Sequence, residues 1–361
     1  PPRLQAWLLL TIVLVAANWC RRSNYELFHY THHAVWFFFV AAIIHAWSHW
    51  YYMVGGLALY AFDKLTRLVR STSMARVVAV RTTPGYTHLE VDASVFAASG
   101  GHYAGQYAFL NIPAISVMEW HPFTISSAPQ VPVTQGRQVI TFDIKSMGDG
   151  TWTAAVEDWA RSVTDPASLV IHLDGPYGRA ARYQDAAHLV MVAGGIGITP
   201  FYSIVTDIFA RKRNAAAYGD AGAIQTVRLV WGCRSVTLLQ MFEPQLAALR
   251  AEFPTAFTYT VYLTHGQRMT SVKADGIDAP LLSPHEDVAA SPHTNALSPS
   301  SANRPVAGRP DLTSLFASIA KTCAPQQHTM AMVCGPTAMI DDVSKLAAAH
   351  RMDFHAEEFY F

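Results

Sequence analysis

The stretch that decides the fold of this chain is His121-Pro122-Phe123-Thr124-Ile125-Ser126-Ser127-Ala128-Pro129, which lies between two segments rich in β-forming residues. It places an imidazole, an aromatic ring and a hydroxyl group on one short strand. A protein that holds a flavin needs such a set: a flat apolar face, a hydrogen-bonding group for the ring nitrogens and a partner for the pyrophosphate. A second stretch, Gly194-Gly195-Ile196-Gly197-Ile198-Thr199-Pro200, places small residues where a strand turns into a helix, so that a dinucleotide phosphate can approach the helix N-terminus. The two stretches together predict electron transfer from a nicotinamide dinucleotide to a flavin.

The composition bounds the class of protein. With 361 residues the chain can form two or three domains. Hydrophobic residues make up 51% of it and charged residues only 14%, and the apolar excess is concentrated in the first sixty or so residues. The net charge is zero, which argues against a nucleic acid as partner. The four cysteines have neither metal-ligand nor disulfide-framework spacing, so we expect the part beyond the apolar region to be cytosolic and reduced.

The N-terminal region, residues 1–70, is predicted to form transmembrane helices. Residues 4–20 are an uncharged aliphatic run followed by two arginines, and residues 30–62 are a second uncharged region, rich in aromatic residues and followed by basic ones. Because a helix needs about 20 apolar residues to cross the hydrocarbon core, the second region is long enough for two helices with a turn near residues 48–52. Basic clusters favour the cytoplasmic side, so three such helices would deliver the rest of the chain to the cytosol. Buried core helices are the alternative interpretation.

Histidines mark the middle one of these three helices. Ionisable side chains at membrane depth are costly and point to function, and imidazole is a common axial ligand of haem iron. His32 and His45 are thirteen residues apart. On one helix they would lie about 20 Å apart along the axis, which suits one haem near each leaflet, but roughly 140° apart around it. His33 and His45 would differ by about 120°, so geometry alone does not choose the inner ligand.

The remainder of the chain is predicted to hold two further domains. Short alternating segments broken by Pro and Gly indicate an antiparallel β-barrel over residues 72–184. From residue 185 to 361, strands alternate with helices, which indicates a parallel, Rossmann-like α/β sheet. The clearest strand segments are residues 76–80, 87–92 and 138–145 in the first of these domains, and residues 188–193, 227–231, 257–263 and 328–333 in the second. Residues from about 266 to 305 have no periodicity, and we expect a disordered surface insertion there.

Several motifs in this order resemble the NADPH oxidase and ferric reductase superfamily, and the resemblance covers nearly the whole chain. The motifs are Tyr30-Thr31-His32-His33 with His45, residues 121–129, residues 195–201, Gly308-Arg309-Pro310, Cys334-Gly335-Pro336 and the ending Phe354-His355-Ala356-Glu357-Glu358-Phe359. Three of them, at 195–201, 308–310 and the ending, look more like the oxidases than like the yeast reductases. The resemblance implies FAD, NADPH and two b-type haems as cofactors.

For the flavin site, the resemblance implies roles at the matching positions. His121, followed by Pro122, would contact the pyrophosphate of FAD. Phe123 would stack on the isoalloxazine, and Thr124 would bond to a flavin nitrogen. The second flavin segment of the family matches Lys145, Trp152 and Thr153. Phe123 as a barrel core residue is the alternative.

For the nicotinamide site, the resemblance assigns the phosphate turn to Gly195, Gly197, Thr199 and Pro200. Arg234, in the pair Cys233-Arg234, is well placed to bind a 2′-phosphate, which would favour NADPH over NADH. Cys334, followed by Gly335 and Pro336, would head the loop beside the nicotinamide. A terminal aromatic, either Phe359 or Phe361, would cover the flavin until the nicotinamide displaces it. A solvated Arg234 and a merely buried Cys334 are the alternatives.

For the haems, the resemblance selects His32 over His33 as inner ligand and adds His45 as outer ligand. Members of the family carry the partner ligands on an earlier helix. The chain begins at Pro1 and not at a methionine, so we expect a missing N-terminal part.

The expected protein is therefore an integral membrane enzyme with cytosolic FAD and NADPH domains. Electrons would pass from NADPH through FAD and two haems to dioxygen or ferric iron on the far side, with dioxygen favoured by the style of the motifs. Membrane lipid, and regulatory or membrane subunits, are the expected partners. A membrane-anchored flavin reductase without haem and a non-catalytic subunit that binds partners are the alternatives, although intact flavin and nicotinamide motifs argue against the second.

Overall fold

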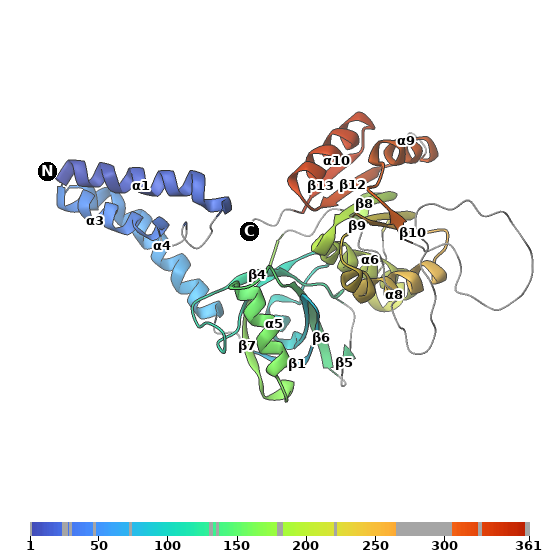
Figure 1. Cartoon of the computed structure of the whole chain (residues 1–361), viewed down its shortest axis with the longest axis horizontal. Helices are drawn as coiled ribbons and strands as arrows, with labels where there is room; N and C mark the ends of the chain where they lie inside the picture. Colours follow the sequence, from blue (N-terminus) through green and yellow to red (C-terminus); the bar gives the residue numbers. More distant parts are fainter. Residues whose placement is uncertain are drawn as a thin grey trace, which may run out of the picture. The chain divides into compact units, whose positions relative to one another are not determined.

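The computed structural model describes residues 2–23, 28, 31–45, 48–71, 74–129, 133–134, 137–178, 183–219, 222–264, 305–323 and 327–357 (Figure 1). The chain divides into two compact units, one of Pro1–Ser73 with Phe359–Phe361 and one of Met74–Glu358. Residues 266–304 of the expected insertion lie outside the described residues. So do the C-terminal aromatics Phe359, Tyr360 and Phe361.

The first unit is helical. Its long helices are α1 (Pro2–Ser23), α3 (Val35–His45) and α4 (His49–Ser71). Among the described residues, no helix combines the length and the apolar character needed to cross a membrane. The single helix expected to carry both His32 and His45 is interrupted at Ala34. There the N–H group donates to the carbonyl of Thr31, three residues back at 3.1 Å, in a turn that precedes α3.

The second unit begins with the predicted antiparallel sheet, which is confirmed. Its seven strands lie in the order β4-β3-β7-β1-β2-β6-β5, and every pair described is antiparallel. Ser126, just after β4, donates its N–H to the carbonyl of Thr141 in β6 at 2.9 Å, which brings one end of the sheet against the next-to-last strand at the other end, as in a barrel. The strands are β1 (Met74–Thr83), β2 (Tyr86–Asp92), β3 (Tyr107–Asn111), β4 (His121–Thr124), β5 (Val133–Thr134), β6 (Arg137–Lys145) and β7 (Val170–Tyr177).

The barrel core follows from the alternation of apolar residues along these strands. One buried cluster joins side chains from most strands with helix α5 (Trp152–Ser162), which lies against the barrel. The hydroxyl of Thr151 caps α5 by accepting from the N–H of Ala154 at 3.2 Å. The fully buried members of this core are Val77, Leu89, Val91, Ala108, Leu110, Ile125, Ile140, Phe142, Val156 and Ile171.

The predicted parallel sheet is also confirmed. Its order is β11-β10-β9-β8-β12-β13, and all the pairs described are parallel. The strands are β8 (His188–Gly194), β9 (Thr226–Cys233), β10 (Phe257–Leu263), β11 (Val306–Ala307), β12 (Thr329–Cys334) and β13 (Asp353–Ala356).

Helices cover both faces of this sheet (Figure 1). On one face α9 (Leu312–Thr322) and α10 (Thr337–Ala349) bury Phe316 and Val343 against β8 and β12. On the other face lie α6 (Ile198–Arg213) and α8 (Val236–Glu252). From β8 the chain continues to its neighbour β9 on one side and only later forms β12 on the other side. The strand order therefore changes direction at β8. Ligands of open α/β sheets bind at such a reversal, beyond the carboxyl ends of the strands.

Hydrogen bonds join the barrel to the α/β layer. Ser203 of α6 donates its hydroxyl to the carbonyl of Ser127 at 2.8 Å, and the N–H of Gly105 reaches the same hydroxyl at 3.4 Å. A Cβ on Gly105 would lie 3.3 Å from Ile204, so the barrel backbone approaches α6 closely. This contact fixes the barrel against the strand-to-helix turn that precedes α6.

An acidic network lies beside this junction and lines a cavity of about 460 Å³. His88 Nδ1 is 2.7 Å from Asp143 Oδ1, and His88 Nε2 is 3.5 Å from Glu90 Oε1. Burial favours the neutral imidazole, but the hydrogen bond to Asp143 and the charges of Asp143 and Glu90 outweigh it and raise the pKa of His88 above its ordinary value.

Candidate functional site

The expected flavin site forms where β4 meets the first turn of α5. The ring of His121 stacks on Trp152 with centroids 4.4 Å apart, and the ring of Phe123 stacks on the same indole at 5.9 Å. Residues about thirty apart in the sequence are thus brought together. Phe123 is also partly buried against the barrel core, so its ring serves that core as well.

Two buried ring nitrogens at this place have no hydrogen-bond partner among the described residues: His121 Nε2 and Trp152 Nε1. Burial lowers the pKa of His121, although the charge of Glu119 opposes the shift. A buried polar atom without a partner costs free energy, so such a pair is typical of a site completed by a ligand.

The approach to α5 suits a phosphate group. Gly148 and Gly150 have positive φ angles of 110° and 78°, which form the turn that leads into the helix. The N–H of Met147 donates to the hydroxyl of Thr153 at 2.9 Å and fixes this turn. The first N–H groups of a helix point outward and favour an anion. The unpartnered nitrogens and this helix start therefore fit the pyrophosphate of FAD.

Thr124 and Lys145 lie at the ends of two barrel strands. Thr124 is buried at the end of β4, opposite Tyr107 of β3. The ring of Tyr107 lies 5.9 Å from that of Tyr177. These two tyrosines form an aromatic wall beside Thr124, and sequence reasoning gave neither ring a role. Lys145 is exposed at the end of β6. Burial raises the pKa of Cys233, and the positive charge of Lys145 acts in the opposite direction.

The expected nicotinamide site forms where the parallel sheet reverses its order. The turn Gly195–Gly197 connects β8 to α6, and Gly195 has a positive φ of 56°. The indole of Trp231 donates to the carbonyl of Gly195 at 2.9 Å, and the hydroxyl of Thr199 to that of Ile196 at 3.1 Å. These bonds hold the turn in place at the start of α6, where Pro200 is also buried.

The loop after β12 packs directly on this turn. A Cβ on Gly197 would lie 2.6 Å from the carbonyl oxygen of Cys334 and 2.9 Å from its sulfur. A Cβ on Gly194 would lie 3.0 Å from Pro336 and 3.3 Å from Gly335. The two predicted motifs, almost 140 residues apart in the sequence, therefore interlock, and only glycine fits at 197.

Cys334 is held as a protonated thiol. It is only 1% exposed, and burial together with the charge of Glu357 raises its pKa. The N–H of Glu357 donates to the carbonyl of Val333 at 2.9 Å, and His355 Nε2 lies 2.8 Å from the Glu357 carboxylate. Sequence reasoning identified this C-terminal motif without giving Glu357 or His355 a role, and the parallel pairing of β13 with β12 is what brings them to Cys334.

Cys233 and Arg234 have opposite environments at the end of β9. Cys233 is fully buried, with its sulfur 3.0 Å from the carbonyl of Ser235, and burial raises its pKa. Arg234 is exposed between β9 and α8. An exposed cation beyond the carboxyl end of a strand is accessible to a phosphate group.

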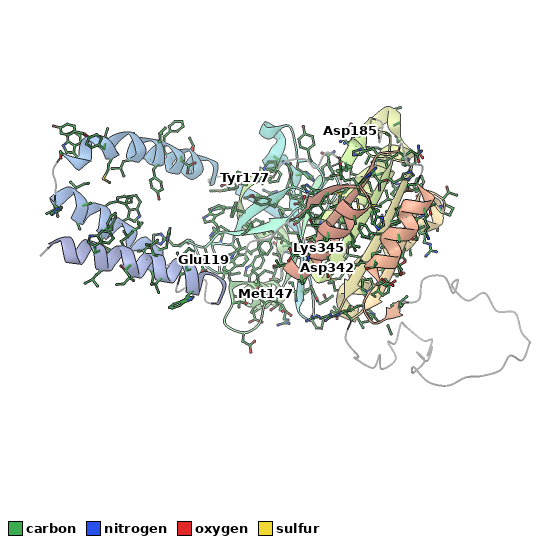
Figure 2. The ribbon with its side chains drawn as sticks, turned by 90° about the horizontal axis from the view of Figure 1, so that it is seen from above. Glu119, Met147, Tyr177, Asp185, Asp342 and Lys345 are labelled. Carbon is green, nitrogen blue, oxygen red and sulfur yellow. The ribbon has the colours of Figure 1, made fainter. Side chains whose placement is uncertain are left out.

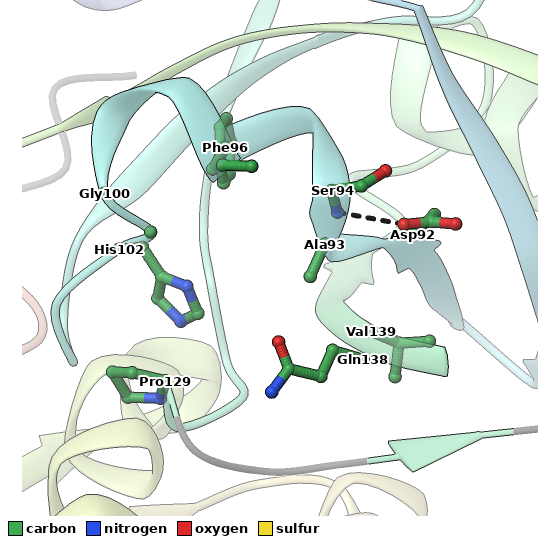
Figure 3. Close-up of a pocket in the computed structure, with 11 residues that line it drawn as sticks. Asp92, Ala93, Ser94, Phe96, Gly100, His102, Pro129, Gln138 and Val139 are labelled. Atoms are coloured by element: carbon green, nitrogen blue, oxygen red, sulfur yellow. Dashed lines mark hydrogen bonds between the residues drawn. The ribbon is translucent and has the colours of Figure 1, made fainter. Parts of the chain in front are cut away.

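The larger of the two cavities described in this unit lies elsewhere. It has a volume of about 660 Å³ and lies beside the short helix η1 (Ala93–Ser99), with Asp92, His102 and Gln138 among its lining residues (Figure 3). Burial lowers the pKa of His102, whose Nε2 lies 3.2 Å from the carbonyl of Ser127. No residue predicted to bind a cofactor lines this cavity.

The expected haem ligands lie in the helical unit. His32 is exposed in the short helical segment 31–33 before α3, with its ring 5.2 Å from that of Phe28, and His45 is exposed at the end of α3. Among the described residues, no group of three or more His, Cys, Asp or Glu side chains could hold a metal ion.

Comparison with known proteins supports the same division into two reductase domains. Residues 74–181 match the family model of an FAD-binding domain, and residues 186–348 match that of the ferric reductase NAD binding domain. The chain is similar in fold to the CS-b5R domains of human Ncb5or, with a TM-score of 0.52 and 15% identity over 78% of this chain and 68% of that one. It is also similar to the cytochrome P450 reductase GcoB of Amycolatopsis, with a TM-score of 0.50 and 17% identity over 79% of this chain and 69% of that one.

Curated relatives carry two kinds of name. Ferric reduction oxidase 8, mitochondrial, of Arabidopsis thaliana is 32% identical over 62% of this chain and 30% of its own length. A superoxide-generating NADPH oxidase heavy chain of Dictyostelium discoideum is 29% identical over 64% of this chain, and human NADPH oxidase 3 is 28% identical over 71%. The chain spans 46% and 52% of the lengths of these two relatives. With both reductase domains matched and relatives of both names, this chain belongs to the NADPH oxidase and ferric reductase superfamily of oxidoreductases.

Proposed function

We propose that this protein transfers electrons from cytosolic NADPH through FAD and two b-type haems to dioxygen on the far side of a membrane, giving superoxide. The observation that carries the proposal is the assembly of two complementary sites in one compact unit. One is the stacked pair His121 and Trp152 at the start of α5, and the other is the turn Gly195–Gly197 interlocked with Cys334.

In the flavin site, FAD would lie along β4 with its pyrophosphate at the start of α5. His121 Nε2 and Trp152 Nε1 would donate hydrogen bonds to it, and Thr124 would bond to the flavin ring at the end of the strand. A bound flavin supplies the conversion of a two-electron donor into one-electron steps. The protein residues bind and orient it.

In the nicotinamide site, the turn at 195–197 would accept the dinucleotide phosphates, and Arg234 would bind the 2′-phosphate. Cys334, as a neutral thiol, would lie beside the nicotinamide without adding a charge. Glu357, held by β13 and His355, would stay next to the thiol. A residue from the C-terminal end, Phe359 or Phe361, would cover the flavin in the absence of nicotinamide.

The helical unit would anchor the protein in the membrane. Its helices expose many large apolar side chains, among them Trp7, Phe37, Ile44, Tyr52 and Leu59. Exposed apolar surfaces of this extent mark contact with lipid or with another protein. His32 and His45 would each supply one axial haem ligand, and the partner ligands would come from a further helix. Regulatory or membrane subunits would complete the assembly.

The acceptor is the point on which the relatives differ. Some are named as superoxide-generating NADPH oxidases and others as ferric reduction oxidases. We infer dioxygen from the oxidase-like motifs at 195–201, 308–310 and the C-terminus. An assay with NADPH that compares superoxide formation with reduction of a ferric chelate distinguishes the two, since the alternative is a ferric reductase of the same superfamily.

The experiment that tests the electron path is an anaerobic visible spectrum of the membrane-embedded full-length protein before and after NADPH. We expect the flavin band to bleach while reduced b-type haem bands appear. Flavin bleaching without a haem signal would reject His32 and His45 as ligands and leave a membrane-anchored flavin reductase. A preparation that neither retains FAD nor bleaches would point to a non-catalytic subunit.

A further inference from the structure

The barrel carries a cluster of exposed apolar side chains in the loop before β4 and at the start of β1. Val117 and Met118, in the loop between β3 and β4, are 72% and 84% exposed, and Met74 at the start of β1 is 70% exposed. Four of the eight exposed large hydrophobic residues described in this unit belong to the cluster. We name it the loop patch and define it as Met74, Val117, Met118, Trp120 and Val170.

The members of the loop patch are connected by pairing and stacking. Met74 is the direct partner of His172 in the antiparallel pair of β1 and β7, and Val170 is paired with Arg76 two residues further on. The ring of Trp120 stacks on that of His172 with centroids 6.3 Å apart. His172 therefore links the start of β1 to Trp120, in the same loop as Val117 and Met118.

Hydrogen bonds hold the loop that carries the tip. The amide of Asn111, itself 1% exposed, donates to the carbonyls of Ser116 and Glu119 at 2.7 and 2.8 Å. The N–H of Ser116 donates to the carbonyl of Ile112 at 3.0 Å. A buried amide that holds a loop in one conformation, with apolar side chains standing free at its tip, presents them for insertion into an apolar medium.

We propose that the loop patch inserts into the interfacial region of a lipid bilayer, with Val117 and Met118 entering first. The inference rests on the membrane attachment in the proposed function. Strand β1 begins three residues after α4, so the chain enters the patch directly from the helical unit. Neither described cavity includes a residue of the patch. Exposed apolar side chains gain free energy when they are buried in the apolar boundary of a lipid layer.

The charges beside the loop patch bear on whether its binding to lipid depends on the headgroup charge. Arg76 and Glu119 are both exposed beside it and carry opposite charges (Figure 2 labels Glu119). Because they cancel, apolar insertion and not attraction to anionic lipid would bind the patch. The expected contact is thus independent of the lipid headgroup charge.

The test uses the full-length protein in lipid nanodiscs, with the photoreactive amino acid benzoylphenylalanine at position 118. Position 345, an exposed lysine on α10, is the control, and position 117 is a second site in case substitution at 118 disturbs folding. Mass spectrometry identifies what each probe has bound after illumination. We expect lipid adducts at 118 and 117, several-fold above those at 345, with equal yields in phosphatidylcholine alone and with phosphatidylglycerol added.

Other results overturn the inference. Cross-links from 118 and 117 to a peptide of this chain or of a second copy would assign the patch to a protein contact. A lipid yield no higher than at 345, or one that requires phosphatidylglycerol, would exclude apolar insertion. Bleaching of the flavin by NADPH in the same nanodiscs separates the two proposals, because it reports electron transfer whether or not lipid adducts form.

Discussion

Replacing Gly197 by alanine tests whether the glycine-rich turn and the Cys334 loop are as closely packed as the structure indicates. The added Cβ would lie 2.6 Å from the carbonyl oxygen of Cys334, whereas ordinary contact begins at 3.4 Å. The carbonyl would have to move by the difference, about 0.8 Å. It lies at the end of β12, a strand buried along its whole length, so it cannot move alone. Overpacking of this kind costs about 1–3 kcal/mol.

The assay is thermal unfolding, followed by the fluorescence of released flavin, together with the KM for NADPH. In a unit of this size each kcal/mol lowers the melting temperature by roughly 2–4 °C. We also expect the KM to rise, because displacement of the turn moves the N–H groups that would bind phosphate. Gly232→Ala is the matched control, since its Cβ would meet nothing closer than 3.7 Å in the same sheet. An unchanged melting temperature and KM in Gly197→Ala would refute the interlock.

Three further predictions concern charge and protonation. Arg234→Gln should raise the KM for NADPH about tenfold and leave that for NADH unchanged, because only NADPH carries the 2′-phosphate; equal increases for both would contradict this role. Cys334 should resist iodoacetamide in the native protein at pH 8, because burial and a neighbouring carboxylate raise its pKa. The partly exposed Cys323 should react under the same conditions, and peptide mass spectrometry measures both. The His88 imidazole has a raised pKa in the folded state, so its contribution to stability is complete below the unfolded pKa of about 6.5 and is lost as pH rises through the folded value. The wild type should therefore exceed His88→Gln in unfolding free energy by the largest amount at low pH. A difference that grows as the pH rises would contradict the raised pKa of His88.

The two sheets could be predicted from the sequence because each has its own local period. Alternation over residues 87–92 and 138–145 predicts half-buried antiparallel strands, and these segments form β2 and β6. The apolar segments 188–193 and 328–333 predict buried parallel strands, and they form β8 and β12. The flavin and nicotinamide motifs could also be located in the sequence, since residues 121–129 and 194–200 are contiguous and chemically distinctive.

Some local features escaped prediction. The interruption at Ala34 was missed because the surrounding residues are apolar and helix-compatible, and only the hydrogen bond to Thr31 reveals the turn. Tyr107 and Tyr177 were missed because single aromatic residues in strands usually belong to a core.

What the sequence by itself determined is the order and the type of the two sheets and the stretches that predict cofactor sites, because these depend on periodicity and on residues close together in the chain. Only the tertiary structure decided which of those stretches meet. The stacking of His121 on Trp152, the close contact of Gly197 with Cys334 and the approach of Glu357 to the same thiol all join segments whose pairing no local pattern encodes. They arise because the closed barrel brings β4 against the start of α5, and because the parallel sheet places β8, β12 and β13 side by side. The physical reason is that the local sequence decides whether a segment forms a helix or a strand. The contacts between distant segments arise only when the apolar faces of all these helices and strands are buried together.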